Sequence, residues 1–101
     1  MFDKAKQMYS LAKKAKEMQK ELKATEVEAS SNDNSVKVIL TGEMKVKAIE
    51  INENELKPEN KRQLEEKMSR VFNEAISRSQ AISASRAKEM MGDLGINIPG
   101  M

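Results

Sequence analysis

The chain has 101 residues with 34% charged and 39% hydrophobic side chains, a formal net charge of +2, and no cysteine, histidine or tryptophan. The usual catalytic base, nucleophile and soft metal ligands are therefore missing, so we expect no enzyme, no cofactor, no metal and no small-molecule substrate. No apolar run approaches the roughly 20 residues of a membrane span. We expect one cytoplasmic domain whose modest core calls for a second copy.

The charges are distributed unevenly along the chain. Residues 1–23 hold seven lysines against three acids, residues 24–60 four lysines against eight acids, and residues 61–101 seven basic against five acidic side chains. The small net charge hides this asymmetry, which bears on possible partners.

Residues 3–24 are predicted to form the first helix, because apolar side chains recur at alternating steps of three and four. On the opposite side, Lys6, Lys13 and Lys20 follow one another at heptad spacing. One face is predicted to pack and the other to meet a negatively charged partner. The apolar seam consists of Met8, Leu11, Ala15, Met18, Leu22 and Thr25.

Three short strands are predicted next, over residues 26–29, 36–41 and 44–51, with the third antiparallel to the second. Turn-forming residues fill positions 30–35, and a tight connection is expected at 41–43. The apolar phase of the third strand slips near Ala48. A β-bulge or partial burial of both faces would explain this slip equally well.

A long helix is predicted from Pro58 to Gly92, because one apolar stripe continues through that range. Its length of roughly 50 Å exceeds what a three-stranded sheet can cover, so it must project or meet another element. We expect an α+β fold in two layers, with a helix, a three-stranded antiparallel sheet and a long C-terminal helix (α-β-β-β-α), as a homodimer. We expect a single domain over residues 1–91 and a flexible tail over residues 92–101.

Two basic windows are the candidate binding surface. The first is the lysine-rich opening helix, and the second lies between Glu74 and Glu89, where no acid interrupts a run rich in serines. Cations and short hydrogen-bond donors are the groups that bind phosphates. The scarcity of aromatic residues favours duplex DNA over single strands. The predicted DNA-binding residues are Lys6, Lys13, Lys16, Lys20, Arg78, Arg86 and Lys88.

Other interpretations of these residues stay open. A lysine line on an amphipathic helix is more often a solvated face, and the arginines could pair with glutamates across a dimer. The chain could be a helical protein-protein adaptor without DNA binding, and a basic helix lying on an anionic membrane is a weaker third hypothesis. Residue chemistry alone favours nucleic-acid binding only slightly.

The layout resembles the YbaB/EbfC family of bacterial nucleoid-associated proteins. The segments that carry the resemblance are MYSLAKKAKEMQKEL, VKVILTGEMKVKAIEIN, the helical VFNEA at residues 71–75 and the tail GINIPGM. The family often has glycines between its first two strands, where this chain has residues 30–35. The resemblance implies a homodimer with projecting, tweezer-like helices. It also implies cytoplasmic, nucleoid-associated DNA binding without enzymatic activity.

Overall fold

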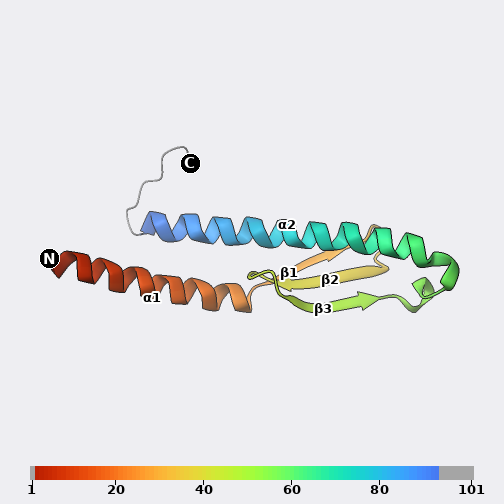
Figure 1. Ribbon diagram of the computed structural model, residues 1–101, viewed down its shortest axis with the longest axis horizontal. Coiled ribbons are helices and arrows are strands. Elements are labelled where there is room, and N and C mark those ends of the chain that lie inside the picture. Colours follow the sequence, from red (N-terminus) through yellow and green to blue (C-terminus); the bar gives the residue numbers. More distant parts are fainter. Residues whose placement is uncertain (1, 94–101) are drawn as a thin grey trace.

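A computed structural model describes residues 2–93 of the chain (Figure 1). The predicted α-β-β-β-α order is confirmed. From residue 94 onward, the expected tail lies outside the described residues. The predicted boundary between domain and tail at residue 91 therefore stays a prediction. Two short 3-10 helices, η1 (Glu53–Glu55) and η2 (Pro58–Asn60), lead into the last helix. The main elements are α1 (Phe2–Ala24), β1 (Glu26–Ser30), β2 (Val36–Thr41), β3 (Val46–Ile51) and α2 (Lys61–Asp93).

The three strands form one antiparallel sheet in the order β1-β2-β3. Ile39 pairs with Ala48 whereas Leu40 pairs with Val46, which leaves Lys47 as an extra residue in β3. Of the two explanations for the slip in apolar phase near Ala48, the structure therefore shows the bulge.

The loop between β2 and β3 is longer than predicted, and β3 begins at Val46 rather than at residue 44. Met44 has a φ of 65°, a left-handed conformation that a strand does not accommodate. Its N–H donates to the carbonyl of Thr41 at 2.9 Å, which closes the turn. The Gly42 N–H donates at 2.9 Å to the carbonyl of Leu22, so this loop also holds the end of α1.

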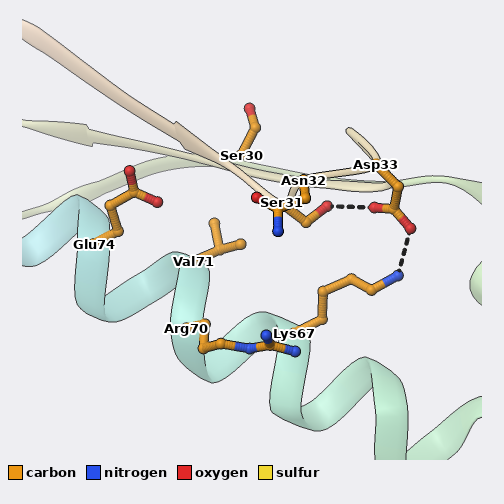
Figure 2. Close-up of a pocket in the computed structure, with 8 residues that line it drawn as sticks. All are labelled: Ser30, Ser31, Asn32, Asp33, Lys67, Arg70, Val71 and Glu74. Carbon is orange, nitrogen blue, oxygen red and sulfur yellow. Dashed lines mark hydrogen bonds and ion pairs between the residues drawn. The ribbon is translucent and has the colours of Figure 1, made fainter.

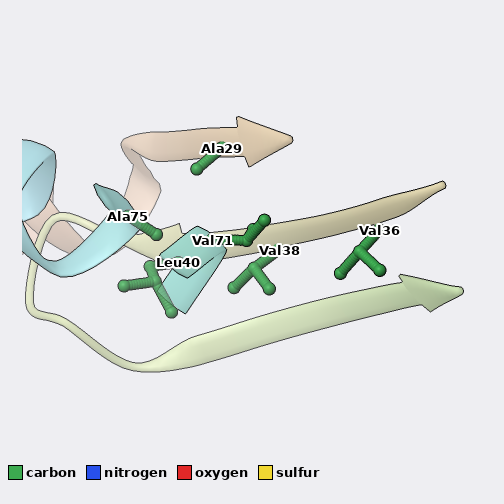
Figure 3. Close-up of a cluster of buried hydrophobic side chains, with 6 residues drawn as sticks. All are labelled: Ala29, Val36, Val38, Leu40, Val71 and Ala75. Atoms are coloured by element: carbon green, nitrogen blue, oxygen red, sulfur yellow. The ribbon is translucent and has the colours of Figure 1, made fainter. Parts of the chain in front are cut away.

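The core lies between the inner face of the sheet and the first half of α2 (Figure 3). Along β2, buried and half-buried side chains alternate, as expected of a strand with one covered face. Burying each valine or leucine of this cluster contributes roughly 1.5–3 kcal/mol. The buried cluster consists of Ala29, Val36, Val38, Leu40, Val71 and Ala75.

Helix α2 extends well past the sheet, and α1 lies beside its second half in the opposite direction (Figure 1). The boundary is marked by Ser79, whose buried Oγ donates to the carbonyl of Thr41 at 2.9 Å. The molecule is therefore elongated, with extents of 68 × 27 × 15 Å. We call residues 2–24 of α1 together with residues 80–93 of α2 the arm.

The apolar seam of α1 is covered only near its C-terminal end. Leu22 is 4% exposed and Met18 is half-buried, whereas Met8 and Leu11 are 73% and 42% exposed. The arm therefore carries apolar side chains that nothing in the described chain covers. Over residues 2–93, neither long helix has a stretch apolar enough to cross a membrane.

Candidate nucleic-acid interface

The ion pair between Glu21 of α1 and Arg86 of α2, at 3.6 Å, joins two exposed side chains at one rim of the contact between the helices of the arm. In an antiparallel pair, the residues just before these two lie together on one side. This first side therefore holds Lys20 and Ser85, whereas Leu22, which is 4% exposed, and the half-buried Ala87 lie toward the contact itself.

The first side of the arm is cationic, and we call it the basic side. Heptad spacing places Lys13 and Lys6 on the same side as Lys20, with steps of about 10.5 Å along α1. All three side chains are exposed, and none makes an ion pair with a residue whose side chain the structure describes. On α2, Arg78 lies seven residues before Ser85 and therefore also on this side. The structure thus keeps the three lysines in one line, with Arg78 beyond the end of α1, where it reaches β1.

The two predicted arginines are already paired with acids within the chain. Arg78 donates to the carboxylate of Glu74 at 2.6 Å and to the carbonyl of Glu28 on β1 at 2.7 Å. Besides Glu21, Arg86 contacts Glu89 at 3.3 Å. Arg86 is exposed at the rim of the contact between the helices, where both acids reach its guanidinium. The second window, free of acids in sequence, is therefore partly neutralised in space.

The remaining predicted residues, Lys16 and Lys88, are exposed on the outer flanks of the arm. Lys16 lies on the side of α1 that faces away from α2, inclined toward the basic side. Lys88 lies on the side of α2 that faces away from α1. Neither makes an ion pair with a residue whose side chain the structure describes. Both positions broaden the cationic surface without extending the lysine line.

The outer face of the sheet offers no comparable cationic surface. Lys37 lies 3.8 Å from Glu28 and 3.9 Å from Glu50, and Lys47 pairs with Glu26. Because the acids on this face balance or exceed the lysines, a phosphate backbone would gain little there. Among the described residues, the arm is the better place for a polyanion.

A pocket of about 280 Å³ lies between the β1–β2 turn and α2 (Figure 2). Beside it, the Lys67 ammonium contacts Asp33 at 2.8 Å, Ser35 at 2.9 Å and Glu55 at 3.0 Å. Hydrogen bonds from Lys67 and from neighbouring serines hold the pKa of Asp33 well below its usual range. Bonds to Asp33 and Glu55 in turn raise the pKa of Lys67. We call this group the Lys67 clasp, and its charges are satisfied internally.

The structure adds two residues, Arg70 and Tyr9, to the candidate binding residues. Arg70 is exposed at the pocket and makes no ion pair with a residue whose side chain the structure describes, while its neighbours Glu66 and Glu74 pair with other arginines. Tyr9 is 74% exposed and lies on the basic side. The sequence contains the spacing that could have identified Tyr9, because Tyr9 follows Lys6 by three residues and precedes Lys13 by four.

Exposed apolar side chains lie away from the lysine line: Met8 and Leu11 on the arm, and further residues at the β3 edge of the sheet. We call them together the apolar side. Because Arg78 reaches β1, the opposite flank of α2 lies toward β3. There Val46, Ile49 and Ile76 are 54%, 46% and 37% exposed. Val46 and Ile49 pair with inward-facing residues of β2, so they share the inner face of the sheet but lie beyond the cover of α2.

Comparisons with known proteins bear on the family and the fold of the chain. The family described as the YbaB/EbfC DNA-binding family matches residues 1–94. A nucleoid-associated protein of Afipia carboxidovorans is 35% identical over 96 residues, which cover 95% of this chain and 90% of that protein. One from Prochlorococcus marinus is 31% identical over 100 residues, covering 99% and 83%. The fold is similar to that of an uncharacterized protein from Helicobacter pylori, with TM-score 0.77, 17% identity and coverage of 83% and 88%.

Proposed function

Because the chain belongs to the YbaB/EbfC DNA-binding family, we propose that it binds double-stranded DNA as a homodimer, mainly through phosphates, with the basic side of the arm. It is a nucleoid-associated protein. We place it in the cytoplasm at the nucleoid, where it influences nucleoid organisation and gene expression. We expect it to catalyse no reaction. The observation that carries the proposal is the line of Lys6, Lys13 and Lys20, exposed and without ion pairs to residues whose side chains the structure describes.

The chemistry of the basic side favours contacts with phosphates over reading of bases. Lysine is a flexible point charge and lacks the planar fork with which arginine reads guanine. Two helices side by side are about 20 Å wide, which exceeds the major groove of about 12 Å. The arm therefore lies along the phosphate ridges, and affinity depends on charge more than on sequence.

The apolar side supports the homodimer. It combines half-exposed Val46 and Ile49 with the uncovered seam residues Met8 and Leu11, a larger apolar exposure than a monomer of this size needs. A second copy would bury these side chains. Because the apolar side is opposite the basic side, each subunit can dimerise and bind DNA at the same time. The cationic surfaces of two subunits then act on one duplex.

The experiment is a series of mobility-shift titrations of the full chain with a short duplex at several salt concentrations. The logarithm of the affinity should fall by roughly 0.9 per neutralised phosphate for each logarithmic unit of salt. Replacing Lys13, Lys16 and Lys20 by glutamate should lower the affinity on the order of 100-fold or more. The circular dichroism should stay unchanged, because all three side chains are exposed.

A matched control separates local from overall charge. The same change at Lys45, Lys57 and Lys61 alters the net charge equally, but these exposed lysines lie outside the arm, on loops and at the start of α2. The control should keep most of the affinity. Equal losses in the two variants would remove the basic side as the site. Failure of the natural chain to bind duplex at low salt would overturn the proposed function.

One observation favours a second candidate, a helical adaptor that binds another protein. Met8 and Leu11 offer exposed apolar side chains along the arm, as a groove-binding helix does. An adaptor would bind its protein partner with an affinity that survives high salt, and it would not retard DNA. The salt series distinguishes the two, since phosphate binding weakens steeply as salt rises.

A further inference from the structure

Tyr9 lies among the lysines of the basic side. It is one helical turn from both Lys6 and Lys13 and two turns from Lys16, and all four side chains project into solvent. With 74% of its surface exposed, Tyr9 is as uncovered as the most exposed apolar residue of the seam, Met8. A large aromatic ring therefore stands within the proposed phosphate-binding surface.

Neither the core nor the proposed dimer accounts for this ring. The core lies between the sheet and α2, whereas Tyr9 is exposed in the N-terminal half of α1. The apolar seam of Leu11 and Ala15 projects from roughly the opposite flank of α1. A second copy packed on the apolar side would leave Tyr9 exposed. The partner of the ring must therefore approach the basic side.

We propose that Tyr9 is a DNA contact, in which its ring lies against a deoxyribose and its hydroxyl donates a hydrogen bond to a phosphate oxygen. This inference rests on the proposed function. Tyrosine combines an apolar body with a polar tip, which matches the alternation of sugar and phosphate along a DNA strand. Lys6 and Lys13 hold the phosphates on either side, so the backbone meets the ring without distortion of the helix.

The residues around Tyr9 on the surface of α1 favour DNA over a membrane as the partner of the ring. A helix that inserts into a bilayer surface places apolar residues beside its aromatic anchor. The long side chains nearest to Tyr9 on the helix surface are instead lysines, which are exposed like the ring. The uncovered apolar residues Met8 and Leu11 project away from Tyr9 and cannot insert together with it.

The first test compares two substitutions in the salt series. Tyr9→Phe removes only the hydroxyl and should weaken duplex binding about threefold to tenfold for each bound subunit, the effect of one hydrogen bond. Tyr9→Ala also removes the ring and should weaken binding further. Because tyrosine is uncharged, neither change should alter the salt slope, whereas Lys13→Gln should reduce it by about 0.9 for each bound subunit. Gln19→Ala, an exposed residue off the basic side, should change nothing.

The second test uses the natural chain, since Tyr9 is its one tyrosine and it has no tryptophan. The tyrosine fluorescence should change on titration with a short duplex and saturate with the mobility shift. A response to anionic phosphatidylserine vesicles but not to duplex would overturn the inference in favour of a membrane.

The outcomes also separate this inference from the proposed function. If the lysine variants lose binding while Tyr9→Ala and the fluorescence show no effect, Tyr9 is not a contact and the DNA function stands. If the natural chain does not bind duplex, both proposals fail together.

Discussion

At the scale of single residues, Gly42 fixes how closely the β2–β3 loop approaches α1. A Cβ at this position would lie 2.8 Å from Cδ2 and 2.9 Å from the backbone carbonyl oxygen of Leu22. The Leu22 side chain could rotate away from the added Cβ. The Leu22 carbonyl could not, because it belongs to the last turn of α1 and already accepts a hydrogen bond from the Gly42 N–H. The two segments would therefore have to separate.

We expect Gly42→Ala to lower the free energy of unfolding by about 1–3 kcal/mol, as for overpacking elsewhere. Urea unfolding followed by circular dichroism measures this loss. Gly92→Ala is the matched control: it lies in α2 with no atom within 4 Å of the added Cβ, so it should be neutral or stabilise by up to about 1 kcal/mol. Equal stability of the two variants would contradict the close approach.

The Lys67 clasp gives stability a defined dependence on pH. The pKa of Asp33 lies below its ordinary 3.8 in the folded chain, so its contribution is complete above that value and is lost as the pH falls. The pKa of Lys67 lies above its ordinary 10.5, so its contribution is complete below that value and is lost as the pH rises. The clasp therefore contributes fully between about pH 4 and 10.

Asp33→Asn isolates the acidic limb of this dependence. The natural chain should be more stable than the variant at pH 7, and the difference should shrink between pH 5 and pH 2 as the carboxylate is protonated. Urea titrations of both chains at a series of pH values measure this difference. A constant difference over that range would show that Asp33 does not contribute through its charge.

At the scale of elements, the arm separates lysines that face solvent from an arginine that joins two helices. Lys20 is exposed and without an ion pair to a residue whose side chain the structure describes, whereas Arg86 contacts Glu21 at 3.6 Å and Glu89 at 3.3 Å. We expect Lys20→Gln to weaken duplex binding more than Arg86→Gln does. Mobility shifts at one low salt concentration give both affinities. A greater loss from Arg86→Gln would show that its ion pairs open on binding.

The sequence predicted the elements well where the signals were local. Strand alternation, the polar run at residues 30–35 and the phase slip near Ala48 all depend on neighbours in the chain, and the structure confirms the three strands and the bulge. The start of β3 was wrong by two residues, because the left-handed backbone at Met44 depends on the closure of the loop.

The candidate site was less predictable, because its basic side chains pair with groups that are distant in the sequence. Heptad spacing alone put Lys6, Lys13 and Lys20 in one line, and the structure leaves them exposed. The partners of Arg86 and Arg78 include Glu21 on α1 and the Glu28 carbonyl on β1, which the acid-free window could not reveal. Whether these residues contact DNA stays a prediction.

At the scale of the whole molecule, two opposite surfaces have separate proposed functions: the basic side binds DNA and the apolar side binds a second copy. The basic side runs along the arm and past the β1 edge, where Arg78 reaches the sheet. The apolar side runs past β3, where Val46 and Ile49 are only partly covered. The heptad seam of α1 therefore packs as part of a longer apolar surface rather than as a coiled coil within the chain. A homodimer built on this surface would present two basic sides to one duplex.

Ile49→Glu tests the dimer directly. Ile49 is 46% exposed, so a glutamate can stay solvated in the single chain, but a second copy would bury its charge at a large desolvation cost. In sedimentation equilibrium, the natural chain should have twice its 11.4 kDa mass and the variant the mass of one chain, with unchanged circular dichroism. Duplex affinity should fall with dimerisation, because two linked basic sides bind more tightly than one.

Lys45→Glu serves as the control for this change, since the exposed Lys45 lies in the nearby β2–β3 loop but not among the apolar residues. It should remain a dimer with near-natural affinity. If Ile49→Glu also remains a dimer, the second copy binds elsewhere and the apolar side stays open for a different partner. A natural chain that sediments as a monomer at micromolar concentrations would contradict the homodimer itself. DNA binding would then rest on one basic side, with correspondingly lower affinity and a smaller salt slope.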